Sequence, residues 1–171
     1  DAALSRRKPG FKSPWERHYQ ETRHLPAMSI PEENRPSLLR RLSAVLYDGM
    51  LLIALWMGAG ALWIGLHGGN AAPAGDGPFR LYLLGVAYAF FVGFWIWGGR
   101  TLGMQAWRLR LIDAEGNRVT LRAATNRFVA AILSWLPAGA GFLWALIDRE
   151  GLTWHDRLSK TYLYLDPKAR R

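Results

Sequence analysis

The chain has 171 residues, half of them hydrophobic, yet its mean hydropathy is only −0.03 because apolar runs alternate with strongly polar segments. Aromatic residues make up 13%, and many lie in or beside the apolar runs, where indole rings favour the level of the lipid headgroups. The absence of cysteine excludes a disulfide framework, a thiol nucleophile and any cysteine-based metal site. This distribution fits a bilayer better than a soluble core and predicts one membrane domain with polar ends.

The net charge of +9 arises from 22 Lys and Arg residues against 13 Asp and Glu residues. Arginine-rich segments flank the apolar runs and lack the interleaved exposed aromatic residues of a nucleic-acid groove, so we expect no nucleic-acid partner. The basic residues fit contact with anionic lipid at the cytoplasmic face, and they set the topology of the chain.

Residues 1–37 form a polar arm whose five prolines would repeatedly interrupt a helix, so no packed core is expected there. Its aromatic residues Phe11, Trp15 and Tyr19 are candidates for docking on a partner; the alternative is a basic tail held near anionic lipid. Because the arm precedes a long apolar run, we expect that run to be retained rather than cleaved as a signal peptide. Ser37 has a side-chain oxygen that can cap the helix predicted to follow it.

Two apolar runs are long enough to cross a membrane. Residues 43–66 span about 36 Å as a helix, which exceeds the roughly 30 Å thickness of the hydrocarbon core. After a glycine-rich loop, residues 81–97 span about 25 Å and form the second predicted crossing. We therefore predict an all-α membrane protein with two full spanning helices.

The segment after the second crossing has a β-type pattern. Residues 107–112 alternate polar and apolar side chains, residues 113–117 are turn formers, and residues 118–121 are predicted to return as the second strand of a hairpin. A further β-type run at residues 161–165 would complete a small sheet at the cytoplasmic rim. The alternative is an amphipathic surface helix over residues 101–111.

The third apolar run, residues 128–147, is interrupted between Pro137 and Gly141. Nine Lys and Arg residues precede the first crossing, six follow the second and six lie in the C-terminal tail, but the loop between the crossings has one. Since cytoplasmic loops hold the excess of Lys and Arg, one further crossing would leave the basic tail outside. We therefore predict a broken, re-entrant hairpin that returns the tail to the cytoplasm, with a third full crossing as the alternative. This topology describes a multi-pass protein of the bacterial inner membrane with a cytoplasmic N-terminus.

Five short motifs follow one another along the chain. They are Arg41-Leu-Ser-Ala-Val-Leu-Tyr-Asp48, Gly99-Arg-Thr-Leu-Gly-Met104, Arg108-Leu-Arg-Leu-Ile-Asp-Ala-Glu-Gly116, Asn126-Arg127 and Trp154-His-Asp-Arg-Leu158. In this order they resemble the RDD family of integral membrane proteins, and the resemblance covers a membrane domain at residues 38–165, between the arm and a basic tail at residues 166–171. It implies a small multi-span protein of mostly uncharacterised role, for which transport, ion exchange or accessory roles in membrane complexes are proposed. The arginine and two aspartates that name the family correspond to Arg41, with Arg40 beside it, Asp48 and Asp156.

Asp48 lies inside the first predicted crossing, where a carboxylate should face protein or water because a charge in the bilayer costs about 2.5 to 3.5 kcal/mol or more. Arg41 is about 10 Å away along the helix, so a distant segment should supply its partner, with Arg127 and Arg157 as the leading candidates. The charged residues form either a structural cluster of ion pairs or a site for a proton or cation. The full set is Arg40, Arg41, Asp48, Arg127, His155, Asp156 and Arg157.

No catalytic constellation is recognisable in the sequence. The four His residues are too scattered for a three-ligand metal set, so neither a metal nor another cofactor is expected. Residues 98–103 lack the spacing of a phosphate loop and are interpreted as a turn leaving the bilayer. Without a Ser-His-Asp set or paired carboxylates at catalytic spacing, we expect no enzyme activity.

Two functions fit these features. In the first, the protein is an accessory or scaffold subunit of a membrane complex, and its glycine-rich helix faces and arm bind a membrane-protein partner or a second copy. In the second, Asp48 and Asp156 take up the ion in proton-coupled cation transport. Because two or three crossings supply few helices to enclose a pathway, we favour the subunit.

Overall fold

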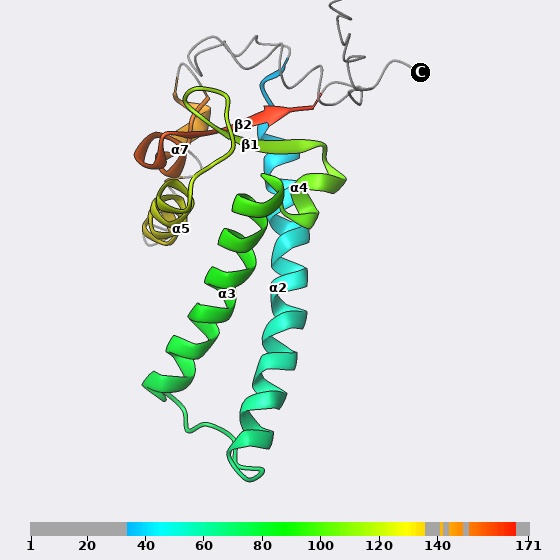
Figure 1. The fold of residues 1–171 in the computed structure, drawn as a ribbon, viewed down its shortest axis with the longest axis vertical. Coiled ribbons are helices and arrows are strands. Elements are labelled where there is room, and N and C mark those ends of the chain that lie inside the picture. The colour runs from blue at the N-terminus through cyan, green and yellow to red at the C-terminus, as the bar shows by residue number, and fades with distance from the viewer. Residues whose placement is uncertain (1–33, 136–140, 142–143, 149–150, 167–171) are drawn as a thin grey trace, which may run out of the picture.

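A computed structural model describes residues 34–135, 141, 144–148 and 151–166. Two long helices form an antiparallel hairpin, and the remaining elements gather at one end of it (Figure 1). The hairpin consists of α2, Leu38–Leu66, and α3, Gly77–Gly98, which are about 43 Å and about 33 Å long. Within the described ranges these are the two helices long and apolar enough to cross a membrane, as the sequence predicted.

Helix α2 begins after Ser37, as predicted, whereas α3 begins four residues before the predicted crossing at residues 81–97. Helix α2 starts at Leu38, directly after Ser37, whose side chain makes no capping hydrogen bond; its backbone carbonyl accepts from the N–H of Arg41 at 3.1 Å. Helix α3 starts after Asp76, whose carboxylate accepts from the N–H of Phe79 at 2.6 Å, with a proline in the first turn.

Aromatic side chains join the two helices of the hairpin. The indole N–H of Trp56 donates to the carbonyl of Leu83 at 2.9 Å, and the Tyr82 hydroxyl donates to the carbonyl of Ala59 at 3.4 Å. On the outer surface of α2, large apolar side chains are exposed, Met57 among them at 73%. An apolar surface this extensive suits lipid rather than water.

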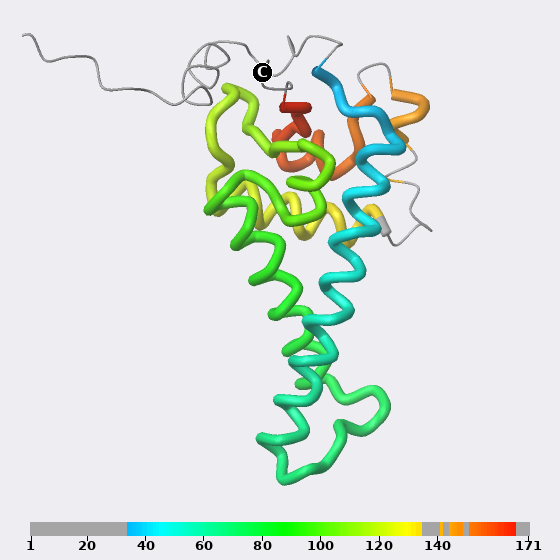
Figure 2. Tube along the Cα trace, turned by 90° about the vertical axis from the view of Figure 1, so that its right-hand side faces the viewer, coloured from blue at the N-terminus to red at the C-terminus, as the bar shows by residue number. Residues whose placement is uncertain are grey.

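The head of the molecule comprises the elements α4, β1, α5, α7 and β2. It lies where α2 begins and α3 ends, while the loop between the two helices lies at the opposite end (Figure 1). Helix α5 is seen nearly end-on in Figure 1 and lengthwise in Figure 2, so it lies across the end of the hairpin rather than along it. The head elements are α4 (Leu102–Ala106), β1 (Leu109–Asp113), α5 (Leu121–Trp135), α7 (Trp154–Ser159) and β2 (Thr161–Leu165).

The predicted small sheet is present, but its strands are paired differently. Strand β1 runs antiparallel to β2, with Leu109 opposite Leu165 and Asp113 opposite Thr161. The predicted return strand at residues 118–121 is wrong. The turn after β1 does form, since the Asp113 carboxylate accepts two backbone N–H groups.

Helix capping explains why the chain does not return as a strand. The hydroxyl of Thr120 accepts from the N–H of Ala123 at 3.3 Å, and its carbonyl accepts from the N–H of Ala124 at 2.9 Å. This cap starts α5 where the hairpin strand was expected. The alternative surface helix over residues 101–111 is also wrong beyond Ala106, because Arg108 has a φ of 60° and the chain then enters β1.

The core of the head lies between the sheet, α5 and the last turns of α3. Leu109 and Leu111 of β1 are 0% and 1% exposed, and they belong to one buried cluster with Phe128 of α5 and Trp95 of α3. Burial of these side chains fixes the sheet over the end of the hairpin.

The third apolar run does not form one continuous helix. Its first eight residues belong to α5, and a short 3₁₀ turn, Trp144–Leu146, follows later. A Cβ on Gly141 would lie 2.5 Å from the Cβ of Ser134, whereas a continuous helix separates residues seven apart by about 10 Å. The turn at residues 137–140 lies outside the described residues, so the re-entrant hairpin stays a prediction.

Candidate functional site

Asp156 occupies the first turn of α7 and faces the interior of the head. Thr153 and Asp156 form a capping box, in which the Thr153 hydroxyl accepts from the N–H of Asp156 and the Asp156 carboxylate accepts from the N–H of Thr153 at 3.1 Å. The side chain of Asp156 is 0% exposed. A carboxylate buried this completely must be charge-balanced or it destabilises the fold.

Two arginines from other helices balance the charge of Asp156. Arg127 of α5 places a nitrogen 2.7 Å from Oδ1, and Arg41 of α2 places one 3.2 Å from Oδ2. Burial opposes ionisation, but the charges of Arg127 and Arg41 and the Thr153 N–H hold the pKa of Asp156 well below its usual range. Asp156 is therefore ionised at neutral pH and ties α2 and α5 to α7.

Arg127 connects this cluster to two further elements of the fold. Its guanidinium donates to the hydroxyl of Thr161 in β2 at 2.7 Å and lies 5.6 Å from the centre of the Trp95 ring in α3. A single side chain on α5 thus contacts α3, α7 and β2. The planar fork of arginine suits this geometry, because several donors point in different fixed directions.

His155 adds a neutral imidazole to the cluster. Its Nε2 lies 2.9 Å from the Thr153 hydroxyl and 3.8 Å from the Asp156 carboxylate. Burial, reinforced by the nearby charge of Arg127, lowers the pKa of His155 to about 3. His155 therefore fills the space beside Asp156 without adding charge at neutral pH.

The remaining predicted members of the charged set lie elsewhere. Arg157 points away from the cluster and pairs with Asp148 at 2.6 Å near the surface. Arg40 is half-buried on α2 and makes no ion pair with the residues that the structure describes. The predicted docking residues Phe11, Trp15 and Tyr19 lie outside the described ranges. Among the described residues there is also no group of three metal-ligating side chains.

Asp48 of α2 is buried in a second, separate site and is 4% exposed. Its Oδ2 accepts from the hydroxyl of Thr101 at 2.5 Å, and its Oδ1 accepts from the backbone N–H of Gly103 at 2.8 Å. The predicted ion pair with Arg127 or Arg157 is wrong, because those arginines are held by Asp156 and Asp148. Asp48 instead anchors the start of α4 to α2.

Glycine at position 103 makes this second site possible. A Cβ there would lie 2.4 Å from the carbonyl oxygen of Ala44 and 2.8 Å from the carboxyl carbon of Asp48. Thr101 caps α4 by accepting from the N–H of Met104 at 3.2 Å, and the same hydroxyl donates to Asp48. The sequence pattern of residues 98–103 predicted a turn, and the short helix α4 was missed. The feature that could have predicted the helix start is Thr101, a capping residue two positions before Gly103.

These features define an integral membrane protein in which a two-helix hairpin carries a head fixed by buried charged residues. The RDD family model matches residues 35–160, a range that contains Arg41, Asp48 and Asp156. The chain belongs to the RDD family, which confirms the resemblance seen in its motifs. No curated protein and no solved structure matches the chain.

Proposed function

We propose that this protein is an accessory or scaffold subunit of a membrane complex, and that its two buried aspartate sites hold the head on the hairpin. The observation that carries the proposal is Asp156, which is 0% exposed and paired with arginines from two other helices. An ion site must exchange its ligand with solvent, whereas this carboxylate is enclosed by its own chain. A buried, balanced ion cluster of this kind favours a structural role.

The hairpin offers faces on which a partner helix can pack. Within the described structure no atom lies within 4 Å of a Cβ placed on Gly58, Gly65, Gly85 or Gly93. Small residues let helix backbones approach closely inside a membrane, where packing drives association. Two spanning helices enclose no pathway alone, so these faces support assembly with another membrane protein or a second copy.

Purification of the full chain from mild detergent tests the subunit role directly. A partner should co-purify at fixed stoichiometry, and replacing Phe11, Trp15 and Tyr19 by Ala should release it if the arm docks. The matched control replaces three polar residues of the same arm, Glu16, His18 and Gln20, by Ala and should retain the partner. A chain that runs only as a monomer, with no fixed partner, contradicts the proposal.

The proposed orientation places the head and the N-terminus in the cytoplasm of the bacterial inner membrane. Six Lys and Arg residues follow α3 in the head segment through Arg127, whereas residues 67–80 at the other end of the hairpin contain one, Arg80 in the first turn of α3. Since the chain has no cysteine, single cysteines report the orientation cleanly. A membrane-impermeant thiol reagent should label Asn70→Cys in spheroplasts and leave Glu115→Cys unlabelled until the membrane is opened. The reverse pattern contradicts the orientation.

One observation favours proton-coupled cation transport as a second candidate function. Asp48 has no cation within ion-pair distance among the described residues, and its carboxylate accepts only from a hydroxyl and a backbone N–H. Carboxylates near a membrane without a fixed counter-charge are the groups that proton relays use. Asp48 is thus the residue on which a transport function would rest.

Flux measurements in proteoliposomes distinguish the two candidates. If the protein transports, a pH gradient should drive Na⁺, K⁺ or Li⁺ flux through the wild type. Asp48→Asn should abolish this flux while the protein remains folded, because an amide releases no proton near neutral pH. Asp76→Asn, at the far end of the hairpin, is the matched control. If the correctly inserted wild-type protein gives no flux, proton-coupled cation transport is ruled out as its function.

A further inference from the structure

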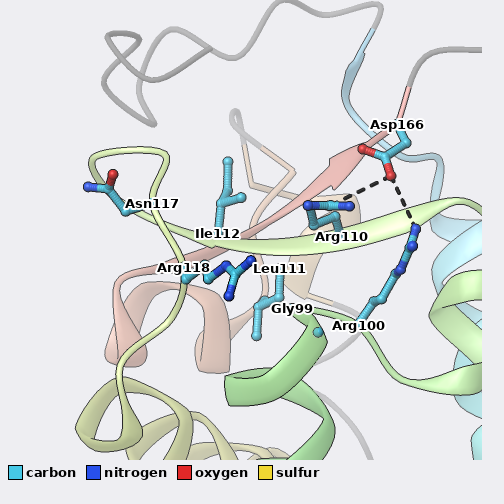
Figure 3. A pocket seen from close by; sticks show the side chains of 9 residues that line it. Gly99, Arg100, Arg110, Leu111, Ile112, Asn117, Arg118 and Asp166 are labelled. Atoms are coloured by element: carbon cyan, nitrogen blue, oxygen red, sulfur yellow. Dashed lines mark hydrogen bonds and ion pairs between the residues drawn. The ribbon is translucent and has the colours of Figure 1, made fainter. Parts of the chain in front are cut away.

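A pocket of about 350 Å³ lies at the end of α3, beside β1 (Figure 3), and neither Asp48 nor Asp156 lines it. Its walls come from the turn after α3, from β1, from the turn that follows β1, and from the end of β2. The lining residues that matter for its chemistry are Gly99, Arg100, Arg110, Asn117, Arg118 and Asp166.

The pocket carries an excess of positive charge. Arg100 and Arg110 share the carboxylate of Asp166, with nitrogen to oxygen distances of 3.4 and 3.6 Å. Arg118 makes no ion pair with the described residues, and its side chain is exposed. Three arginines against one aspartate leave the pocket with a net charge of +2.

The arginines approach the pocket from two sides. In Figure 3 the guanidinium of Arg118 extends toward Gly99 and Leu111, while Arg100 and Arg110 lie together beside Asp166. Arginine forks are donors that bind the several oxygens of a phosphate group, often in bidentate geometry.

The arginines could serve to neutralise the C-terminal end of α3, but this does not explain all of their charge. The C-terminal end of a helix carries about half a negative charge, which attracts nearby cations. Three arginines exceed that half-charge even after Asp166 is subtracted. The carbonyl of Gly99, which faces the strand, already accepts from the N–H of Leu111 at 2.7 Å. The remaining positive charge of the pocket is therefore available to an anion.

The position of the pocket relates it to the membrane surface. Trp97, in the last turn of α3, is 89% exposed, and indole rings prefer the level of the headgroups. We infer that the pocket binds a phosphate group, carried by an anionic phospholipid headgroup or by a small soluble phosphate. The inference holds for a subunit and for a transporter alike, because neither aspartate site takes part in it.

Native mass spectrometry of the full-length, delipidated protein in mild detergent tests the site. The probes are phosphatidylglycerol, phosphatidylcholine and inorganic phosphate, each titrated separately and then in competition. The variants are Arg118→Gln and Arg110→Gln. The control is Arg122→Gln, which removes the same charge from an exposed position on α5 outside the pocket.

We expect phosphatidylglycerol to bind in preference to phosphatidylcholine, and each pocket variant to bind it roughly tenfold more weakly, the loss expected of one charge-assisted hydrogen bond. Arg122→Gln should bind as the wild type does. Binding that inorganic phosphate cannot displace assigns the site to a lipid headgroup; displacement by phosphate with the same dependence on Arg118 assigns it to a soluble phosphate. Equal binding by wild type, both pocket variants and the control overturns the inference.

Discussion

Two aspartates of the same molecule are buried almost equally, yet their surroundings differ. Asp156 is held by two arginines from separate helices, whereas Asp48 is held by a hydroxyl and a backbone N–H with no cation beside it in the described structure. The first site joins α2, α5 and α7; the second joins α2 and α4. Both sites attach the head to the first helix of the hairpin, one through charge and the other through close backbone approach.

This difference shows what each site tolerates. At Asp156, loss of the carboxylate leaves two arginine charges buried, so the charge itself matters most. At Asp48, an amide of similar shape can still bond to both partners, with the bond to Thr101 reversed in direction, so geometry matters most. Replacing Asp by Asn should therefore cost much stability at Asp156 and little at Asp48. Substitutions at the two sites can test this difference.

The largest effect is expected from Asp156→Asn. Removing one member of a buried ion cluster costs roughly 3 to 5 kcal/mol, because the partner charges stay buried without compensation. Unfolding by sodium dodecyl sulfate in mixed micelles, followed by tryptophan fluorescence, measures the loss. Asp166→Asn makes the same change at a side chain that is 31% exposed and should cost at most about 1 kcal/mol. Equal losses from both variants contradict a buried, charge-balanced cluster.

The second largest effect is expected from acidification, which should lower the free energy of unfolding through the Asp156 site. Because the pKa of His155 falls from 6.5 to about 3 on folding, the unfolded chain binds a proton in that window that the folded chain does not. Stability should therefore decrease as the pH falls below about 6.5, by up to about 1.4 kcal/mol per pH unit. The lowered pKa of Asp156 extends the loss to still lower pH.

Thermal unfolding at pH 7 and pH 5 checks this dependence. His155→Gln should reduce the difference between the two unfolding temperatures, whereas His67→Gln, in the exposed loop, should leave it unchanged. A wild type whose unfolding temperature is the same at both pH values would show that His155 is not buried as a neutral group.

A smaller loss is expected from Gly103→Ala at the other site. The new Cβ would meet the Ala44 carbonyl at 2.4 Å, so α4 must move away from α2 at a cost of roughly 1 to 3 kcal/mol. Gly49→Ala in α2, where no neighbouring described atom lies within 4 Å of the new carbon, is the control and should be neutral or slightly stabilising. A tolerated Gly103→Ala would refute the close packing of α4 on α2.

The smallest effect is expected from Asp48→Asn. The amide oxygen accepts from the Gly103 N–H, and the amide nitrogen donates to the Thr101 hydroxyl, so stability should change by less than about 1 kcal/mol. Asp48→Ala, which loses both bonds, should cost roughly 1 to 3 kcal/mol. If Asp48→Asn loses as much stability as Asp156→Asn, Asp48 has a cationic partner, and the two sites do not differ as described.

The sequence predicted the features that depend on local pattern. Hydropathy located both spanning helices, because about twenty consecutive apolar residues are typical of a helix that crosses the hydrocarbon core. The motifs identified the family and pointed to Arg41, Asp48 and Asp156. The start of α2 after Ser37 was predicted, but the start of α3 was placed too late because the apolar run, rather than the preceding polar turn, marked its expected boundary.

Features that depend on pairing between distant segments were not predictable in the same way. Strand β1 pairs with β2, which lies about fifty residues later, because the cap at Thr120 directs the intervening chain into α5. The partners of Asp48 were missed because charge alone suggested an arginine, while a glycine lets a backbone N–H come closer. Charge patterns indicate which residues need partners, and packing decides which partner is reached.

The central claim is that Asp156 joins the first spanning helix to the head through Arg41. A double-mutant cycle tests this claim most directly, with Arg41→Met, Asp156→Asn and the combined variant compared with the wild type by unfolding in mixed micelles. We predict that the combined variant loses less stability than the sum of the single losses, by roughly 0.5 to 3 kcal/mol, because removing Arg41 relieves one uncompensated charge. Strictly additive losses would contradict the claim.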